Sequence, residues 1–222
     1  MSRRRAAHAI ALLLFGLGAW QVASAGWIHA KALLAQRLIA SAWTQARDGG
    51  PARRPWPWAD MRPVARLRVA ARGVDLYVLD NASPRALAFG PAHVGGTAAP
   101  GGFGNTVLVA HRDTHFAFLQ RVELGDEIEV ESAYGRRARY RVREITIVDR
   151  GESRVLDDAG EAQLTLVTCY PFDAVRPGTP WRYVVVAGRI ADPAARLSRS
   201  ARPPERGPIQ GSPASSPAPS AG

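Results

Sequence analysis

The nine residues from Gln163 to Pro171, QLTLVTCYP, constrain the fold more than any other stretch of this sequence. Leu164 and Leu166 fall on one face of an extended chain and Cys169 on the other, as in a β-strand. Pro171 cannot donate to a central ladder, so the strand should end within a residue or two of the cysteine. Cys169 is the only cysteine in the chain. It is therefore predicted where a strand meets a loop, a frequent position for catalytic groups.

A lone cysteine is either a small buried hydrophobic residue or a nucleophile. A nucleophile needs a partner for proton transfer and a cation near the developing oxyanion. The strand-like run 105–110 ends at His111, and Arg182 opens the strand-like run 183–187. We expect three strand ends carrying His111, Cys169 and Arg182 to converge on one rim of an antiparallel barrel.

Further short runs of alternating polar and apolar residues predict an all-β barrel or sandwich. A short helical turn is expected within 81–88, and a short helix anchored by Phe116, Phe118 and Leu119 is expected after His111. The segment 90–104 is rich in Gly, Ala and Pro and is expected to be a long loop. The remaining predicted strands are 64–69, 74–79, 127–131 and 138–148.

The N-terminus predicts a membrane anchor. Three arginines, residues 3–5, precede an uncharged run from Ala9 to Ile28. Twenty helical residues span roughly 30 Å, the thickness of a bilayer core. The arginines should stay in the cytoplasm, which places the rest of the chain on the far side. A cleaved signal peptide is the alternative, because the Ala-Ser-Ala run at 23–25 fits a cleavage site; we favour the uncleaved anchor.

Residues 27–47 are expected to form an amphipathic helix with an apolar stripe, which ends at the Asp-Gly-Gly-Pro run 48–51. A linker follows, in which Trp56 and Trp58 could dock on the folded domain or lie at the lipid headgroups. The stripe consists of Leu33, Leu34, Leu38 and Ile39. The predicted segments are an anchor at 1–30, a helix and linker at 31–60, a catalytic barrel at 61–194 and a disordered Pro/Ser-rich tail at 195–222.

Composition excludes several function classes. The net charge is +10, but Lys31 is the only lysine and no basic stripe with interleaved aromatic residues is present, so we predict no nucleic-acid partner. One cysteine cannot form an internal disulfide. No paired cysteines occur, and His111 and His115 would share a face only if their stretch were helical, so we predict no metal and no cofactor.

Three separated motifs resemble the sortases, a family of membrane-anchored cysteine transpeptidases. These motifs are TLVTC at 165–169, the arginine that opens a V-V-V-A strand, and a strand that ends in Ala-His at 110–111. The run AHRDTHF at 110–116, followed by LGD at 124–126, is most similar to the branch found in Gram-negative bacteria, of class D or E type. The resemblance covers roughly residues 62–192. That branch commonly has glycine where this chain has Ala110.

The resemblance implies a closed eight-stranded β-barrel, preceded by a transmembrane helix, and assigns roles to three residues. Cys169 would attack a backbone carbonyl and hold the acyl group as a thioester. His111 would protonate the leaving amine, and Arg182 would stabilise the oxyanion; Arg176 is the rival, but it lies in mid-loop. Asp113 is expected to cap the next helical turn, with orientation of His111 or contact with substrate as the alternatives. His115 is expected to be structural or exposed to solvent.

The same resemblance implies the partners and the location. The substrate would be a protein with a C-terminal sorting signal, and the acceptor would be an amine or, slowly, water. The chain would cross the inner (cytoplasmic) membrane once, in contact with lipid, with its catalytic domain facing the periplasm or exterior. Two alternatives are an inactive membrane-tethered binding module and a peptidoglycan-crosslinking cysteine transpeptidase. The Ser-x-Gly-Cys signature of the latter does not match residues 168–170.

Overall fold

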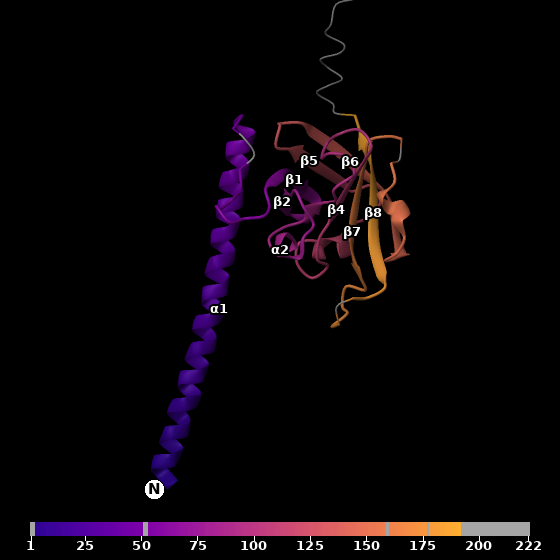
Figure 1. Ribbon diagram of the computed structural model, residues 1–222. Coiled ribbons are helices and arrows are strands. Elements are labelled where there is room, and N and C mark those ends of the chain that lie inside the picture. Colours follow the sequence, from indigo (N-terminus) through magenta and orange to yellow (C-terminus); the bar gives the residue numbers. More distant parts are fainter. Residues whose placement is uncertain (1–2, 51–52, 159, 177, 192–222) are drawn as a thin grey trace, which may run out of the picture. The chain divides into compact units, whose positions relative to one another are not determined.

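The predicted strands close into a β-barrel (Figure 1). The computed structural model describes residues 3–50, 53–158, 160–176 and 178–191. Within them the strands are β1 (Pro63–Val69), β2 (Val74–Leu79), β3 (Ala92–His93), β4 (Asn105–Val109), β5 (Glu127–Ser132), β6 (Arg137–Asp149), β7 (Gln163–Tyr170) and β8 (Trp181–Ile190). The helices are α1 (Arg3–Arg47), η1 (Ala70–Arg72), α2 (Pro84–Leu87), η2 (Ala117–Arg121) and η3 (Ser153–Leu156).

The order around the barrel is β1-β2-β3-β4-β7-β8-β6-β5, and β5 pairs with β1 to close it. This confirms the closed eight-stranded barrel with short helices. The expected antiparallel pairing is correct for most neighbours, but β2 and β3 are parallel, and so are β4 and β7, with Val109 opposite Val167. Because β4 and β7 run the same way, their C-terminal ends lie on the same rim of the barrel.

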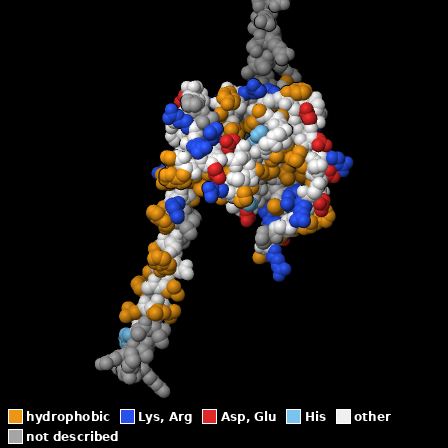
Figure 2. All heavy atoms as spheres, in the orientation of Figure 1, with side chains coloured by type: hydrophobic (Ala, Val, Ile, Leu, Met, Phe, Trp, Pro, Cys, Tyr) orange, Lys and Arg blue, Asp and Glu red, His pale blue; other side chains and the backbone are white. Residues whose placement is uncertain are grey.

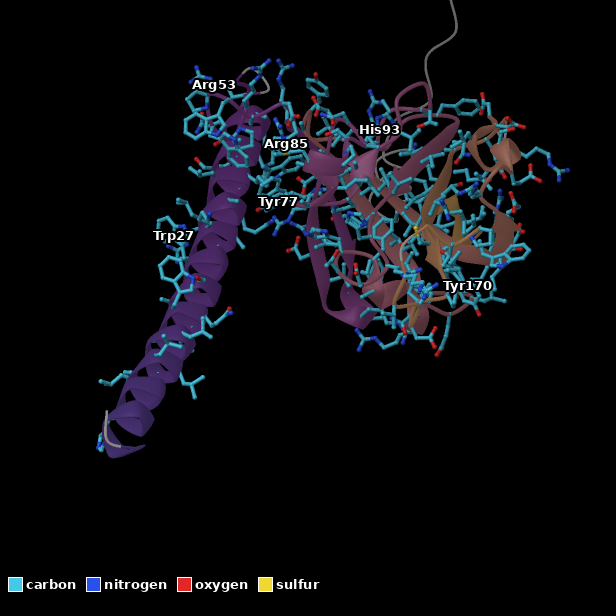
Figure 3. All side chains as sticks on the ribbon, turned by 60° about the horizontal axis from the view of Figure 1, so that its bottom comes forward. Trp27, Arg53, Tyr77, Arg85, His93 and Tyr170 are labelled. Atoms are coloured by element: carbon cyan, nitrogen blue, oxygen red, sulfur yellow. The ribbon has the colours of Figure 1, made fainter. Side chains whose placement is uncertain are left out.

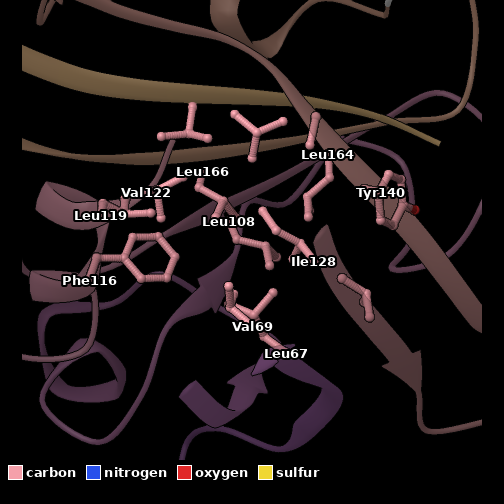
Figure 4. Close-up of a cluster of buried hydrophobic side chains, with 14 of the residues drawn as sticks. Leu67, Val69, Leu108, Phe116, Leu119, Val122, Ile128, Tyr140, Leu164 and Leu166 are labelled. Carbon is pink, nitrogen blue, oxygen red and sulfur yellow. The ribbon is translucent and has the colours of Figure 1, made fainter. Parts of the chain in front are cut away.

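Apolar residues fill both faces of β4 and β7. On the inner face Leu108, Leu164 and Leu166 are fully buried in the main core (Figure 4). This confirms the predicted alternation of the cysteine strand. On the outer face Val107 and Val167 form a second cluster, which also includes Val184 and is covered in part by Val155 of η3. Strands buried on both sides read as nearly continuous hydrophobic runs, as β7 does.

One strand was not predicted. The segment 90–104 was expected to be a loop throughout, but it contains β3, which joins β2 to β4. His93 of this strand lies within hydrogen-bonding distance of the Ala98 carbonyl (3.0 Å) and the Thr97 hydroxyl (3.1 Å), so its ring is part of the local structure.

Helix α1 is continuous, although two segments were predicted, and it ends at Arg47 as expected. Of the predicted apolar stripe, Ile39 is buried against the barrel, whereas Leu33 and Leu34 are 62% and 56% exposed. Small side chains let the helix approach β1 and β2, and Trp43 packs against Tyr77, with ring centroids 6.0 Å apart. Tyr77 lies on the side of the barrel that faces α1 (Figure 3). The buried face consists of Ala35, Ile39, Ala42, Trp43 and Ala46.

The two linker tryptophans differ. Trp56 packs edge-on against Phe89, with ring centroids 5.3 Å apart, and so docks on the domain. Trp58 is 79% exposed.

In the part of the chain that the structure describes, no helix is both long enough and apolar enough to cross a membrane. The predicted anchor therefore stays a prediction. The predicted tail at 195–222 lies outside the described residues.

Candidate active site

The parallel pair β4 and β7 brings His111 and Cys169 to the same level of the barrel rim. Val109 is opposite Val167 in the register, and the next amide, Ala110 N, donates to the Val167 carbonyl at 3.4 Å. His111 and Cys169 each lie two residues beyond the Val109–Val167 pair. Two residues that are far apart in the sequence thus follow neighbouring strands at the same height.

Strand β8 adds the third residue. It runs antiparallel to β7, and Arg182 is directly opposite Cys169 in the register. Directly opposed residues on antiparallel strands share a face, with Cβ atoms about 4.5–5.5 Å apart. The structure therefore brings His111, Cys169 and Arg182 to one rim. Arg176, the rival cation, lies in the loop between β7 and β8 and has an exposed side chain.

The three residues belong to the outside of the barrel rather than to its interior. Thr168 is 2% exposed, and its hydroxyl donates to the Ala110 carbonyl at 2.7 Å, which ties β7 to the end of β4 on the inner side. Because side chains alternate along a strand, Cys169 shares the outer face with Val167. Cys169 is half-buried, which leaves its sulfur partly accessible.

A cleft of about 260 Å³ lies along this outer face, next to the rim. Val109 and Val167 line it from the barrel side, and Arg182 contributes to it from β8. The segment 148–156, which includes η3, forms the opposite wall. Hydrogen bonds from Arg154 lower the pKa of Glu152 in this wall to about 2, so the wall carries a carboxylate at neutral pH.

The guanidinium of Arg182 is held by backbone carbonyls. Its Nη1 donates to the carbonyls of Thr179 and Trp181, both at 2.9 Å. Among the described residues no hydrogen-bond acceptor is found for its Nε and Nη2. An arginine carries five N–H donors, so this side chain keeps donors available for an anion on the cleft side.

His115 lies closer to the site than the sequence suggested. It is half-buried, and burial lowers the pKa of its imidazole, with a further lowering by the charge of His111. The predicted structural or solvent-facing role did not anticipate an electrostatic link between the two histidines.

The predicted capping role of Asp113 is wrong. Helix η2 begins after Phe116, and no side chain caps it. The turn is closed by the backbone instead, since Phe116 N donates to the His111 carbonyl at 3.0 Å. Asp113 is exposed, and among the described residues its carboxylate has no hydrogen-bond partner.

Sequence reasoning missed Arg112, which is only 9% exposed. Its guanidinium donates to Thr179 Oγ1 at 3.3 Å and to the carbonyls of Ala174 and Arg176 at 2.6 and 3.1 Å. Residues 112–116 form a turn, and the acceptors lie more than sixty positions away, so no local pattern in the sequence marks this side chain.

Comparisons with known proteins agree with this arrangement. The family model for the sortase domain matches residues 67–190, more than half of the chain. Sortase D of Bacillus subtilis (strain 168) is 29% identical over 125 residues, which cover 56% of this chain and 62% of that protein. The chain thus spans less than two thirds of that relative's length.

Two solved structures show the same likeness. The sortase D5 transpeptidase of Clostridium perfringens superposes with a TM-score of 0.51 at 25% identity, covering 58% of this chain and 79% of that one. Sortase A of Corynebacterium diphtheriae gives a TM-score of 0.53 at 25% identity, covering 61% and 65%. With a matching family model, a matching barrel and the TLVTC strand at its rim, the chain belongs to the sortase family.

Proposed function

We propose that this chain is a cysteine transpeptidase that cleaves a C-terminal sorting signal in a partner protein and transfers the acyl group to an amine. The observation that carries the proposal is the register, which sets Cys169 opposite Arg182 and level with His111. In the first step the Cys169 thiolate attacks a backbone carbonyl, the C–N bond breaks, and a thioester forms.

His111 moves the protons in this scheme. As an imidazolium it donates a proton to the departing amine, and as a neutral imidazole it accepts one from the incoming amine. Such general acid–base catalysis contributes about 10²- to 10⁴-fold in rate. A free cysteine has a pKa near 8.5, so only a small fraction is thiolate at neutral pH. The exposed position of His111 is consistent with exchange of one amine for another.

Arg182 stabilises the tetrahedral intermediates. The donors on its Nε and Nη2 have no acceptor among the described residues, and they are suited to the oxygen that becomes negative during attack. The apolar cleft beside them suits an extended peptide, with Val109 and Val167 contacting its side chains. In the absence of an amine, water takes its place and the thioester hydrolyses slowly.

We also propose attachment to the inner membrane, with the barrel on the periplasmic or exterior side. Large apolar side chains between residues 12 and 27 of α1 are more than half exposed, and Figure 2 shows hydrophobic side chains along this helix. Burial in lipid would remove this apolar surface from water. These residues are Leu12, Leu13, Leu14, Phe15, Leu17, Trp20, Val22 and Trp27.

Extraction of a membrane fraction with alkaline carbonate tests the attachment. The full-length chain should stay with the lipid. Release of the chain into the supernatant would contradict the attachment.

The transpeptidase proposal is tested with candidate sorting-signal peptides and an added amine. Wild type should yield the peptide–amine product and, without amine, a slower hydrolysis product. Cys169→Ala should yield neither. Labelling with a thiol-reactive sulfone should be faster at Cys169 than at free cysteine and should change in rate in His111→Ala. A thiol that reacts like free cysteine, with no product from any peptide, would instead support an inactive binding module.

A further inference from the structure

We propose that Arg112 and Thr179 form a bridge that positions the loop between β7 and β8, residues 171–180, and with it the guanidinium of Arg182. Both are positioning residues, because neither touches the reacting atoms. The inference rests on the proposed function, since its effect appears in the rate of acyl transfer. It concerns side chains to which the catalytic scheme above assigns no role.

The first observation is that Arg112 is a buried cation without an anion. It is 9% exposed, and among the described residues no carboxylate lies within ion-pair distance. Neutral acceptors from the loop take three of its five N–H donors instead, namely two carbonyls and the hydroxyl of Thr179. Burying a charge is unfavourable unless it is paired or fully hydrogen-bonded. These three hydrogen bonds therefore link the loop to the residue that follows His111 and offset part of the cost of burying the guanidinium.

The second observation is that Thr179 is shared by two arginines. Its Oγ1 accepts a hydrogen bond from Arg112 Nη1 at 3.3 Å, and its carbonyl accepts one from Arg182 Nη1 at 2.9 Å. Arg112 directly follows His111 at the end of β4, whereas Arg182 belongs to β8. A single loop residue thus connects the strand end that carries the general acid to the cation opposite the thiol.

The third observation is that the loop has few other attachments in its described part. Phe172 packs against Tyr183, with ring centroids 5.1 Å apart, next to Tyr170 at the end of β7 (Figure 3). Pro180 accepts a hydrogen bond from the Arg150 amide at 2.6 Å. Between these two ends, side-chain hydrogen bonds to residues 173–176 and 178–179 come from Arg112 and, at the Thr179 carbonyl, from Arg182. In its described part, the middle of the loop therefore depends on these two arginines, and Arg112 alone links it to the end of β4.

Loss of the bridge should leave the thiol and the imidazole in place but release Arg182. A displacement of about 1 Å in a catalytic group can lower the rate about 100-fold. We expect Thr179→Val, which has nearly the same shape but no hydroxyl, to lower kcat about 10-fold with KM nearly unchanged. Thr179→Ser keeps the acceptor and should restore most of the rate. Alkylation of Cys169 by iodoacetamide should proceed within about twofold of the wild-type rate in both variants.

Arg112→Met removes all the loop bonds of the guanidinium and should lower kcat about 10- to 100-fold. The matched control is Arg121→Met, an exposed arginine in η2 without a hydrogen bond or ion pair among the described residues, and it should behave as wild type. If Arg112→Met fails to fold, as judged by thermal unfolding, the Thr179 pair carries the test alone. The double variant Arg112→Met/Thr179→Val should be no slower than Arg112→Met, because both changes break the same bridge.

The outcomes separate the bridge from the proposed function. If wild type turns over and Thr179→Val matches Arg121→Met in kcat, the bridge is refuted and the transpeptidase proposal stands. A parallel fall in kcat and in the iodoacetamide rate would also refute it, because that result indicates general disruption of the site. A wild-type chain that forms no product with any peptide overturns both proposals.

Discussion

Two walls of the barrel hold buried charges in opposite ways. Where α1 meets β1 and β5, Glu131 is 2% exposed and lies within 3.3–3.7 Å of three arginines, Arg47, Arg68 and Arg137. At the rim formed by β4, β7 and β8, Arg112 is 9% exposed and contacts only neutral acceptors on a loop. Opposite charges on neighbouring elements compensate the Glu131 carboxylate. The Arg112 guanidinium depends instead on hydrogen bonds to neutral groups of a loop.

This difference separates stability from activity. The α1 wall is closed by apolar packing and ion pairs, and its contacts do not reach the rim. The rim instead exposes His111, leaves Cys169 half-buried and relies on backbone carbonyls to hold its arginines. Substitutions at the wall should therefore lower the free energy of unfolding without changing turnover. Substitutions at the rim should lower turnover and have less effect on the free energy of unfolding.

The largest effect is expected at the α1 wall. Trp43 is 2% exposed and packs against Tyr77 and Ala133, so Trp43→Ala should lower the free energy of unfolding by about 3–5 kcal/mol. Denaturant titration measures this change. The value of kcat, measured where the variant remains folded, should stay within about twofold of wild type. A large fall in kcat would show that the two walls are coupled.

At the rim, Arg182→Met should lower kcat about 10²- to 10³-fold, the usual effect of removing one oxyanion donor. Steady-state aminolysis of a substrate peptide measures it. Arg176→Met is the control, because that exposed loop side chain has no hydrogen bond among the described residues. An equal fall in kcat in the two variants would contradict the assignment of the oxyanion role to Arg182 rather than Arg176.

A smaller loss of stability should follow Glu131→Gln. Removal of this buried charge leaves its arginines, which are partly exposed, without their shared anion, so unfolding should become easier by about 1–3 kcal/mol. Glu123→Gln is the matched control: that side chain is 80% exposed and pairs with Arg72 at 3.6 Å. Its effect should stay below about 1 kcal/mol. A Glu131 variant as stable as the control would mean that the ion pairs at this wall contribute nothing.

The smallest effect concerns pH. The pKa of His115 is lowered in the folded chain, so the unfolded chain binds more protons below the ordinary value near 6.5. Stability should be complete above that pH and fall as the pH drops from 6.5 towards the lowered pKa. His115→Gln should weaken this dependence, as thermal unfolding between pH 5 and pH 8 would show. If the stability of wild type and variant changes with pH to the same extent, groups other than His115 cause the pH dependence.

The sequence predicted those parts of the fold that depend on local pattern. The alternation of Leu164 and Leu166 placed β7 and its cysteine. The helical turn expected within 81–88 is α2, at whose start the Ser83 hydroxyl accepts from Ala86 N. Strand β3 was not predicted, because two residues are too few to show a periodic pattern. It is defined by its pairing with β2 and β4. We expected the strand ends that carry His111, Cys169 and Arg182 to converge because we assumed that these strands are neighbours in the barrel.

The misses share a physical cause, which is tertiary contact. The buried face of α1 is set by the close approach of its alanines to the barrel, which the helical pattern alone did not indicate. The position of Arg112 depends on hydrogen bonds to a loop that lies more than sixty positions away in the chain. Neither helix propensity nor motif spacing encodes such contacts.

The most direct measurement is the intact mass of the protein after incubation with a candidate substrate peptide and no amine. We predict a mass increase equal to the N-terminal fragment of the peptide, mapped to Cys169, and released by hydroxylamine as expected for a thioester. His111→Ala and Arg182→Met should accumulate it more slowly. An adduct on another residue, or wild-type turnover through a route that persists in Cys169→Ala, would contradict the account.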